Sequence, residues 1–176
     1  AEDNGQRLSK ERGLLILEQI LKKNVKKIIF AGYATDPLNS SYIDELLETT
    51  IKNNAIFGFN TKALKISDRF YKILENNKII KSSYISLSVD AGSNETYNKI
   101  HAVKSKAKIY ENVLKNTQRL GKIRQKNPFD LSAAYLVNIH SGNEYDYEKF
   151  INEFMEAGCN LLRFTFPQQP KDIKTE

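Results

Sequence analysis

The chain alternates five times between a short apolar run, rich in β-branched or aromatic residues, and a longer segment with apolar residues at helical spacing. The apolar runs predict strands at 27–31, 55–60, 84–89, 131–139 and 161–166. Continuous apolar strands that alternate with helices are typical of a parallel sheet covered by helices or curled into a barrel. The pattern therefore predicts an α/β fold of about five repeated units, joined by right-handed crossovers.

Polar residues mark where the helices between these strands should begin. The expected N-caps are Ser9, Ser40 or Ser41, Ser67, Ser93 and Asn143, since short polar side chains satisfy the free N–H groups of a first turn. A helix over 108–120 is expected to end at Gly121, and one over 144–157 to end at Gly158. Each helix has one apolar face for burial.

Length and composition are typical of one globular domain. The chain has 176 residues, of which 40% are hydrophobic and 27% are charged. No apolar stretch is long enough to span a bilayer, and the first residues show no signal-peptide pattern, so we expect a cytoplasmic protein without a membrane partner. The single cysteine, Cys159, excludes an internal disulfide and is expected to be a small buried side chain.

The net charge of +6 at pH 7 raises the question of a nucleic-acid partner. The lysines are spread over the expected helix faces, and the densest group spans 104–108. Basic and aromatic residues do not interleave as they do in single-strand-binding surfaces. Solvated helix faces therefore explain the charge better, and a basic RNA-binding domain ranks last among the candidate functions.

Polar residues follow three strands at what would be one rim of a parallel sheet. They are the segment from Tyr33 to Leu38, the pair Asn60-Thr61, and the segment from Asp90 to Ser93. Parallel α/β folds place their binding sites at this rim. Each segment also has a plainer explanation, because Asp36 before Pro37 can cap a local turn and Asn60-Thr61 can cap the next one. Both explanations stay open.

The third strand carries a second signal. Ser86, Ser88 and Asp90 alternate with apolar residues, so they share one face of the strand. Either they line a lumen or crevice that holds a polar ligand such as a ribose, or the strand is an edge with one face in solvent. Arg163 interrupts the fifth apolar run, and a buried arginine there would require a carboxylate or phosphate partner.

Several common site types are absent from the sequence. His101 and His140 have no metal-ligand spacing, and we expect them to be exposed or in loops. No GxGxxG, P-loop or GxSxG motif occurs. Their absence argues against dinucleotide binding of the Rossmann type, P-loop phosphoryl transfer and α/β-hydrolase chemistry.

In order and spacing, residues 5–167 resemble the radical S-adenosylmethionine (radical SAM) enzymes. Ala34-Thr35-Asp36-Pro37 stands where that family has a Gly-Gly-Glu-Pro-like motif for the methionyl amino group, and Asn60-Thr61-Lys62 stands where it has Thr-Asn-Gly. The segment from Ser86 to Tyr97 looks like the family's strand beside the cofactor ribose. His101-Ala102-Val103-Lys104 resembles the stretch that often follows.

The resemblance implies a partial (β/α) barrel with S-adenosylmethionine along its rim. The cofactor-binding positions that it implies are Thr35, Asp36, Thr61, Ser86, Ser88, Asp90, Asn138 and Arg163. In the family, three cysteines in a CxxxCxxC motif hold a [4Fe-4S] cluster, which this chain's one cysteine cannot do. We therefore expect residues 1–167 to be a barrel fragment without the first strand and cluster loop, and 168–176 to be a frayed tail.

The resemblance also implies an activity for the parent protein. We expect it to cleave S-adenosylmethionine to a 5′-deoxyadenosyl radical, with a reductant such as flavodoxin or ferredoxin and a small-molecule or peptide substrate. The chain alone would then be inactive. Two alternatives remain: a natural paralogue that lost its cluster, or a non-catalytic α/β module that binds a ligand or a partner.

Overall fold

The computed structural model describes residues 8–32, 35–103 and 107–166. Helices and strands alternate along the chain as the sequence predicts. Their bounds are α1 (Lys10–Lys22), β1 (Lys27–Ala31), the 3₁₀ helix η1 (Pro37–Asn39), α2 (Ile43–Lys52), β2 (Ile56–Thr61), α3 (Asp68–Asn76), β3 (Tyr84–Ser88), α4 (Asn94–Ile100), α5 (Ile109–Lys126), β4 (Asp130–Leu136), α6 (Glu144–Glu156) and β5 (Leu161–Thr165). The expected tail at 168–176, the loop residues Tyr33 and Ala34, and Lys104 lie outside the described residues.

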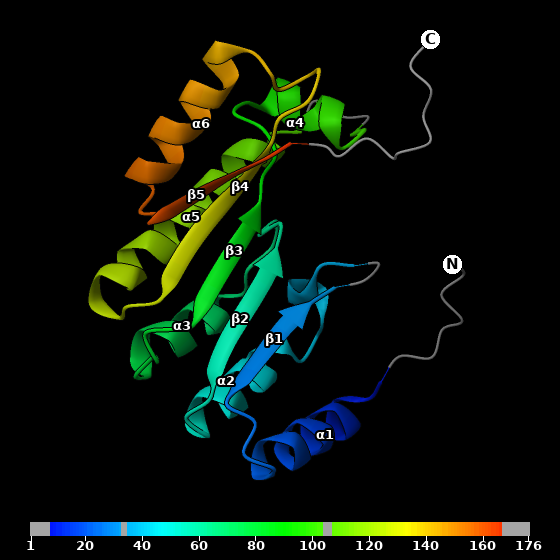
Figure 1. Ribbon diagram of the computed structural model, residues 1–176. Coiled ribbons are helices and arrows are strands. Elements are labelled where there is room, and N and C mark those ends of the chain that lie inside the picture. The colour runs from blue at the N-terminus through cyan, green and yellow to red at the C-terminus, as the bar shows by residue number, and fades with distance from the viewer. Residues whose placement is uncertain (1–7, 33–34, 104–106, 167–176) are drawn as a thin grey trace.

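The five strands form one parallel sheet in the order β1-β2-β3-β4-β5 (Figure 1). Because neighbours in the sheet are also neighbours in the chain, the connecting helices stack along the same side of it. The sheet is not closed, and β1 and β5 form its two edges. The partial barrel that the sequence predicts is confirmed. Since β3 is the central strand, Ser86 and Ser88 do not lie on an edge.

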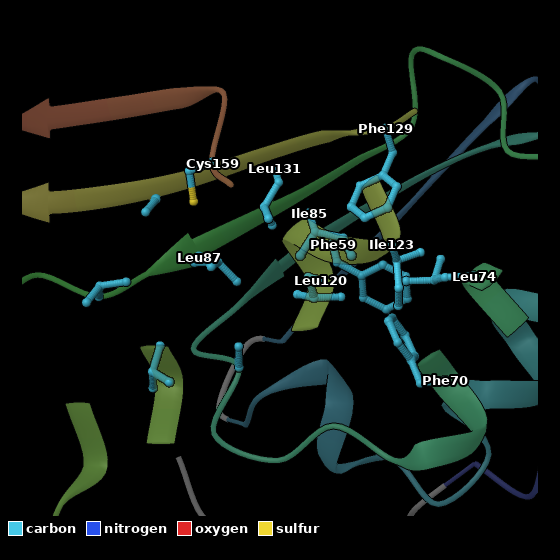
Figure 2. Packing of buried hydrophobic residues seen from close by; sticks show 14 of the residues in the cluster. Phe59, Phe70, Leu74, Ile85, Leu87, Leu120, Ile123, Phe129, Leu131 and Cys159 are labelled. Atoms are coloured by element: carbon cyan, nitrogen blue, oxygen red, sulfur yellow. The ribbon is translucent and has the colours of Figure 1, made fainter. Parts of the chain in front are cut away.

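The hydrophobic core lies between the sheet and the helices (Figure 2). Alternate strand residues point to this side, among them Phe57, Phe59, Ile85, Leu87 and Leu131, each at most 1% exposed. The Phe59 ring stacks on Phe30 with 4.8 Å between centroids and meets Phe70 of α3 edge-on at 5.2 Å. These aromatic contacts join the first two strands to the helix layer.

The other side of the sheet, which we call the open face, has small and polar side chains at its centre and exposed apolar ones, Ile29 and Leu161, on its edge strands. Strand register places Asn60, Ser86 and Ser132 side by side on three neighbouring strands. At the opposite end of the strands, the Tyr84 ring covers Gly58, where an added Cβ would lie 2.4 Å from ring carbons. The polar centre of this face is therefore suited to a polar ligand.

The predicted caps are largely confirmed. The side chains of Ser9, Ser67, Ser93 and Asn143 each accept a hydrogen bond from a backbone N–H of the following helix. The prediction of Ser40 or Ser41 as the cap of α2 is wrong. Tyr42 precedes that helix without a side-chain cap, because Pro37–Asn39 form η1 and Ser40 ends it.

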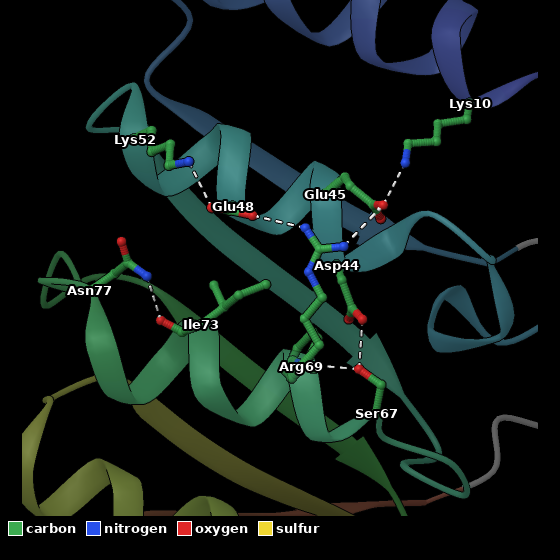
Figure 3. A network of polar contacts seen from close by, with 10 residues as sticks. Lys10, Asp44, Glu45, Glu48, Lys52, Ser67, Arg69, Ile73 and Asn77 are labelled. Atoms are coloured by element: carbon green, nitrogen blue, oxygen red, sulfur yellow. Dashed lines mark hydrogen bonds and ion pairs between the residues drawn. The ribbon is translucent and has the colours of Figure 1, made fainter.

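Ion pairs connect the first three helices on the outer surface (Figure 3). Glu45 of α2 lies 2.6 Å from Lys10 of α1 and 3.1 Å from Arg69 of α3, which also contacts Glu48 at 3.0 Å. Hydrogen bonding to Lys10 is the main cause that lowers the pKa of Glu45. The basic partners, Lys10 and Arg69, are about half exposed, so these ion pairs add little to the free energy of unfolding.

Two boundaries in the second half differ from the prediction by more than one residue. Gly121 does not end α5, which continues to Lys126. A Cβ on Gly121 would lie 1.9 Å from the carbonyl oxygen of Ala157, so the glycine permits α5 and the end of α6 to touch. Strand β4 ends at Leu136 rather than at 139, because the Asn138 side chain and Ser141 form a turn directly after it.

Candidate functional site

A pocket of about 550 Å³ lies at the carboxyl ends of β1, β2 and β3. Its lining includes Thr35, Asp36, Asn60, Thr61, Lys62 and Ser88. Four of the residues implied by the resemblance, Thr35, Asp36, Thr61 and Ser88, are thus brought together from three consecutive strand ends. The volume falls in the range of roughly 300–1,000 Å³ that small-molecule sites occupy. Ser86 lies on the same strand two residues before Ser88, and therefore further from the rim.

Asp36 joins the loop after β1 to the end of β2. Its carboxylate accepts hydrogen bonds from the backbone N–H of Leu38 at 3.0 Å, the hydroxyl of Thr61 at 2.7 Å and the backbone N–H of Lys62 at 2.6 Å. The first of these caps η1, so the local-cap explanation is correct. The same carboxylate also lines the pocket, where its charge is suited to an ammonium group.

Asp90 follows β3 in a left-handed conformation, with φ of 63°. Its backbone N–H donates to the carbonyl of Ala134 at 2.9 Å, which fixes the residue against β4. Burial raises the pKa of the Asp90 carboxyl, and the charges of His101, Lys62 and Arg163 oppose that rise. Positive charge therefore acts on Asp90 from Lys62, directly after β2, and from Arg163 on β5.

Asp146, in the first turn of α6, is a residue that the sequence reasoning missed. It is 2% exposed and accepts hydrogen bonds from the Gly92 backbone N–H at 2.8 Å and the Thr96 hydroxyl at 2.7 Å, with the Tyr135 hydroxyl also 2.7 Å away. It therefore holds the segment after Asp90 against both β4 and α6. Its position three residues after the cap Asn143 was the only signal in the sequence.

A Cβ on Gly92 would lie 1.8 Å from the backbone oxygen of Asp146. Glycine is therefore required for the close approach of the two segments.

Four of the eight implied site residues, Ser86, Asp90, Asn138 and Arg163, do not line the pocket. The expectation that Arg163 is buried is wrong: it is exposed, because β5 is an edge strand whose other side has no neighbour in the described chain. The Asn138 side chain accepts hydrogen bonds from the backbone N–H groups of His140 and Ser141, which makes it a turn residue after β4. Arg163 remains coupled to Asp90 by charge alone.

The described residues contain no group of three or more His, Cys, Asp or Glu side chains placed to hold a metal ion. Cys159 is 4% exposed, and burial raises the pKa of its thiol to about 12, which agrees with the expected buried side chain. His140 is exposed as expected, whereas His101 is half-buried at the end of α4. None of the described helices has both the length and the apolar character needed to cross a membrane.

No protein-family model matches the chain, and no curated protein gives a significant match. Three similar solved structures are of SuiB from Streptococcus suis. One matches with a TM-score of 0.69 at 15% identity, over 98% of this chain and 37% of that one.

The form bound to S-adenosylmethionine has a TM-score of 0.64 at 13% identity, over 89% of this chain and 33% of that one. The form bound to precursor peptide SuiA has a TM-score of 0.67 at 15% identity, over 92% and 34%. This chain thus spans about a third of the structures it matches, and at these identities the likeness shows the fold.

Proposed function

We propose that this chain is the S-adenosylmethionine-binding core of a radical SAM enzyme. The observation that carries the proposal is the pocket at the ends of β1, β2 and β3, where Asp36, Thr61 and Ser88 meet. The fold supports it, because a similar structure, SuiB, was solved with S-adenosylmethionine bound. The sequence resemblance supports it independently, through the order of the three strand-end segments.

The residues present fit the proposed ligand. S-adenosylmethionine has an ammonium group, a carboxylate and a ribose, so it needs acceptors and donors at one rim. Asp36 would accept from the ammonium group, and Ser88 and Asp90 would bind the ribose hydroxyls. Thr61 would act through Asp36, whose carboxylate it orients at 2.7 Å. Lys62 lines the same pocket and would balance the carboxylate.

The residues present do not fit a [4Fe-4S] cluster. Such a cluster takes cysteine thiolates, and the only cysteine in the sequence is buried in the core with a raised pKa. In a radical SAM enzyme the reduced cluster supplies the electron that cleaves bound S-adenosylmethionine. The proposed part of this chain is to bind and orient the cofactor, and the cluster ligands would come from outside it.

Binding is the first test. Titration of the chain with S-adenosylmethionine, followed by calorimetry, should show binding that Ser88→Ala weakens about three- to tenfold, the equivalent of one hydrogen bond of roughly 0.5–1.5 kcal/mol. The matched control is Ser132→Ala, on the same open face but outside the pocket lining. Absence of binding by the unmodified chain, or equal loss in both variants, would contradict the proposal.

The rival function is a non-catalytic α/β module that binds a ligand or a partner, and the lack of a cysteine triplet favours it. Anaerobic iron–sulfur reconstitution of the natural protein containing this chain separates the two. A brown, iron-bearing sample that cleaves S-adenosylmethionine supports the enzyme. A colourless sample that binds the cofactor without cleaving it supports the module.

A peptide substrate is the more specific form of the proposal. SuiB was solved with a precursor peptide, and the centre of the open face carries polar side chains, Asn60, Ser86 and Ser132, that can hydrogen-bond to a peptide. We also propose flavodoxin or ferredoxin as the reductant. The described residues show no further feature that is specific to a peptide or to a reductant.

A further inference from the structure

His101 and Asp90 face each other beside the proposed cofactor site without completing a hydrogen bond. The imidazole Nε2 lies 3.8 Å from Oδ2 of Asp90, which is too long for a hydrogen bond. Nε2 is buried and has no hydrogen-bond partner among the described residues. The two side chains are only 15% and 21% exposed, so the gap lies largely out of solvent.

The protonation of His101 decides what this gap can contain. The imidazole makes a hydrogen bond to the backbone of Val89, whose carbonyl only accepts. Because Nε2 has no partner, the donor to Val89 is Nδ1. A neutral ring then presents the Nε2 lone pair to a carboxylate oxygen, and two acceptors cannot bond to each other. Only the charged ring has a second N–H for Asp90.

The surrounding charges set how readily that proton binds. Burial and the Lys62 ammonium lower the pKa of His101, while Asp90 and the Val89 hydrogen bond raise it, and the net shift is downward. Arg163 acts on Asp90 from β5. The Tyr97 ring packs against the imidazole, with 4.3 Å between the ring centroids. Burial raises the pKa of Tyr97, and the negative charges of Asp90 and Asp36 add to that rise. The charged groups that act on His101 are thus Lys62, directly after β2, and Asp90, after β3.

We propose that His101 is a positioning residue for Asp90: a proton on Nε2 closes the 3.8 Å gap and holds Oδ2, which leaves Oδ1 as the acceptor that the imidazole does not engage. The held carboxylate then accepts from a hydroxyl donor of the ligand. The Lys62 ammonium works against the closed state because its positive charge lowers the pKa of His101. The inference rests on the proposed function only for the identity of the ligand.

A ligand-free titration tests the pair directly. The chain has two histidines, so proton NMR gives two imidazole C2–H signals, and His140→Gln assigns them. In Asp90→Asn the His101 signal should titrate at lower pH than in the unmodified chain, and in Lys62→Gln at higher pH. The His140 signal is the internal control and should not move. An unchanged His101 titration in Asp90→Asn would overturn the proposal.

A second measurement separates positioning from simple packing. The carboxyl carbon signal of Asp90 should follow the titration of His101, and should lose that step in His101→Phe, which keeps a ring against Tyr97. His101→Gln offers an N–H at every pH and should hold the carboxylate without a step. Equal carboxyl signals in the Phe and Gln variants would contradict positioning.

A third measurement compares the binding of S-adenosylmethionine by the variants at pH 7.5. We expect His101→Phe to bind it about three- to tenfold more weakly than His101→Gln, the equivalent of one hydrogen bond. If the two variants bind equally while the unmodified chain binds well, the inference fails and the proposed function stands. If the unmodified chain does not bind at all, the proposed function fails, and the titrations alone decide whether His101 holds Asp90.

Discussion

Replacement of Asp146 should destabilise the protein far more than its single charge suggests. The carboxylate is 2% exposed and accepts hydrogen bonds from the Gly92 N–H at 2.8 Å and the Thr96 hydroxyl at 2.7 Å. The Tyr135 hydroxyl lies 2.7 Å from it and 2.6 Å from a second acceptor, the Ser141 carbonyl. In Asp146→Ala these donors lose their acceptor in a site from which water is excluded. An unsatisfied buried donor costs about 1–3 kcal/mol. Because a hydroxyl can turn to another acceptor, we expect a total loss of about 3–5 kcal/mol.

Urea denaturation followed by circular dichroism measures this loss. Asp146→Asn keeps the shape and one acceptor oxygen, so its free energy of unfolding should lie between those of the unmodified chain and Asp146→Ala. Asp68→Asn is the control, because that carboxylate is 79% exposed and should leave the urea midpoint nearly unchanged. A loss below about 1 kcal/mol in Asp146→Ala would refute the idea that this carboxylate joins β4, α4 and α6.

Two further predictions concern Gly121 and Asp90. Gly121→Ala should lower the free energy of unfolding by about 1–3 kcal/mol, because its Cβ would lie 1.9 Å from the Ala157 carbonyl oxygen. Alanine normally stabilises a helix, so a thermal melt that shows stabilisation would contradict this packing. Burial raises the pKa of Asp90 above its ordinary 3.8, so ionisation of this carboxyl opposes folding. The stability that the neutral carboxyl provides is present at low pH and is lost as the pH rises through the raised pKa. Asp90→Asn, which cannot ionise and tolerates positive φ, should therefore be more stable than the unmodified chain at pH 7 and equal to it near pH 3. Melting temperatures that differ equally at both pH values would exclude this cause.

The strand-end segments show how far the sequence could lead to the site. Thr35, Asp36, Thr61 and Ser88 were identifiable because parallel strands bring their carboxyl ends to one rim, whatever the details of packing. Asp146 was not identifiable in that way, since the three groups that contact it lie 50, 54 and 11 residues away in the chain. Its role depends on how α6 packs, which no local pattern encodes.

Arg163 and Gly121 were misinterpreted for a related reason. An apolar strand around an arginine predicts burial only if another strand covers it, and β5 is an edge of the sheet. A glycine near the expected end of a helix predicts a C-terminus only if no second helix comes close, and here Ala157 does. In both cases the local pattern is compatible with two structures, and the presence or absence of a distant neighbour decides between them.

By itself the sequence determined the alternation of strands and helices, most caps, and the rim on which the polar residues gather. Periodicity and capping are local, so each is decided within a few residues of chain. Only the tertiary structure decided that Asp36 is at once a cap and a pocket wall, that Asp146 fixes the segment after β3, and that His101 stands 3.8 Å from Asp90. Those facts depend on distances between segments far apart in sequence, which only the packed chain defines.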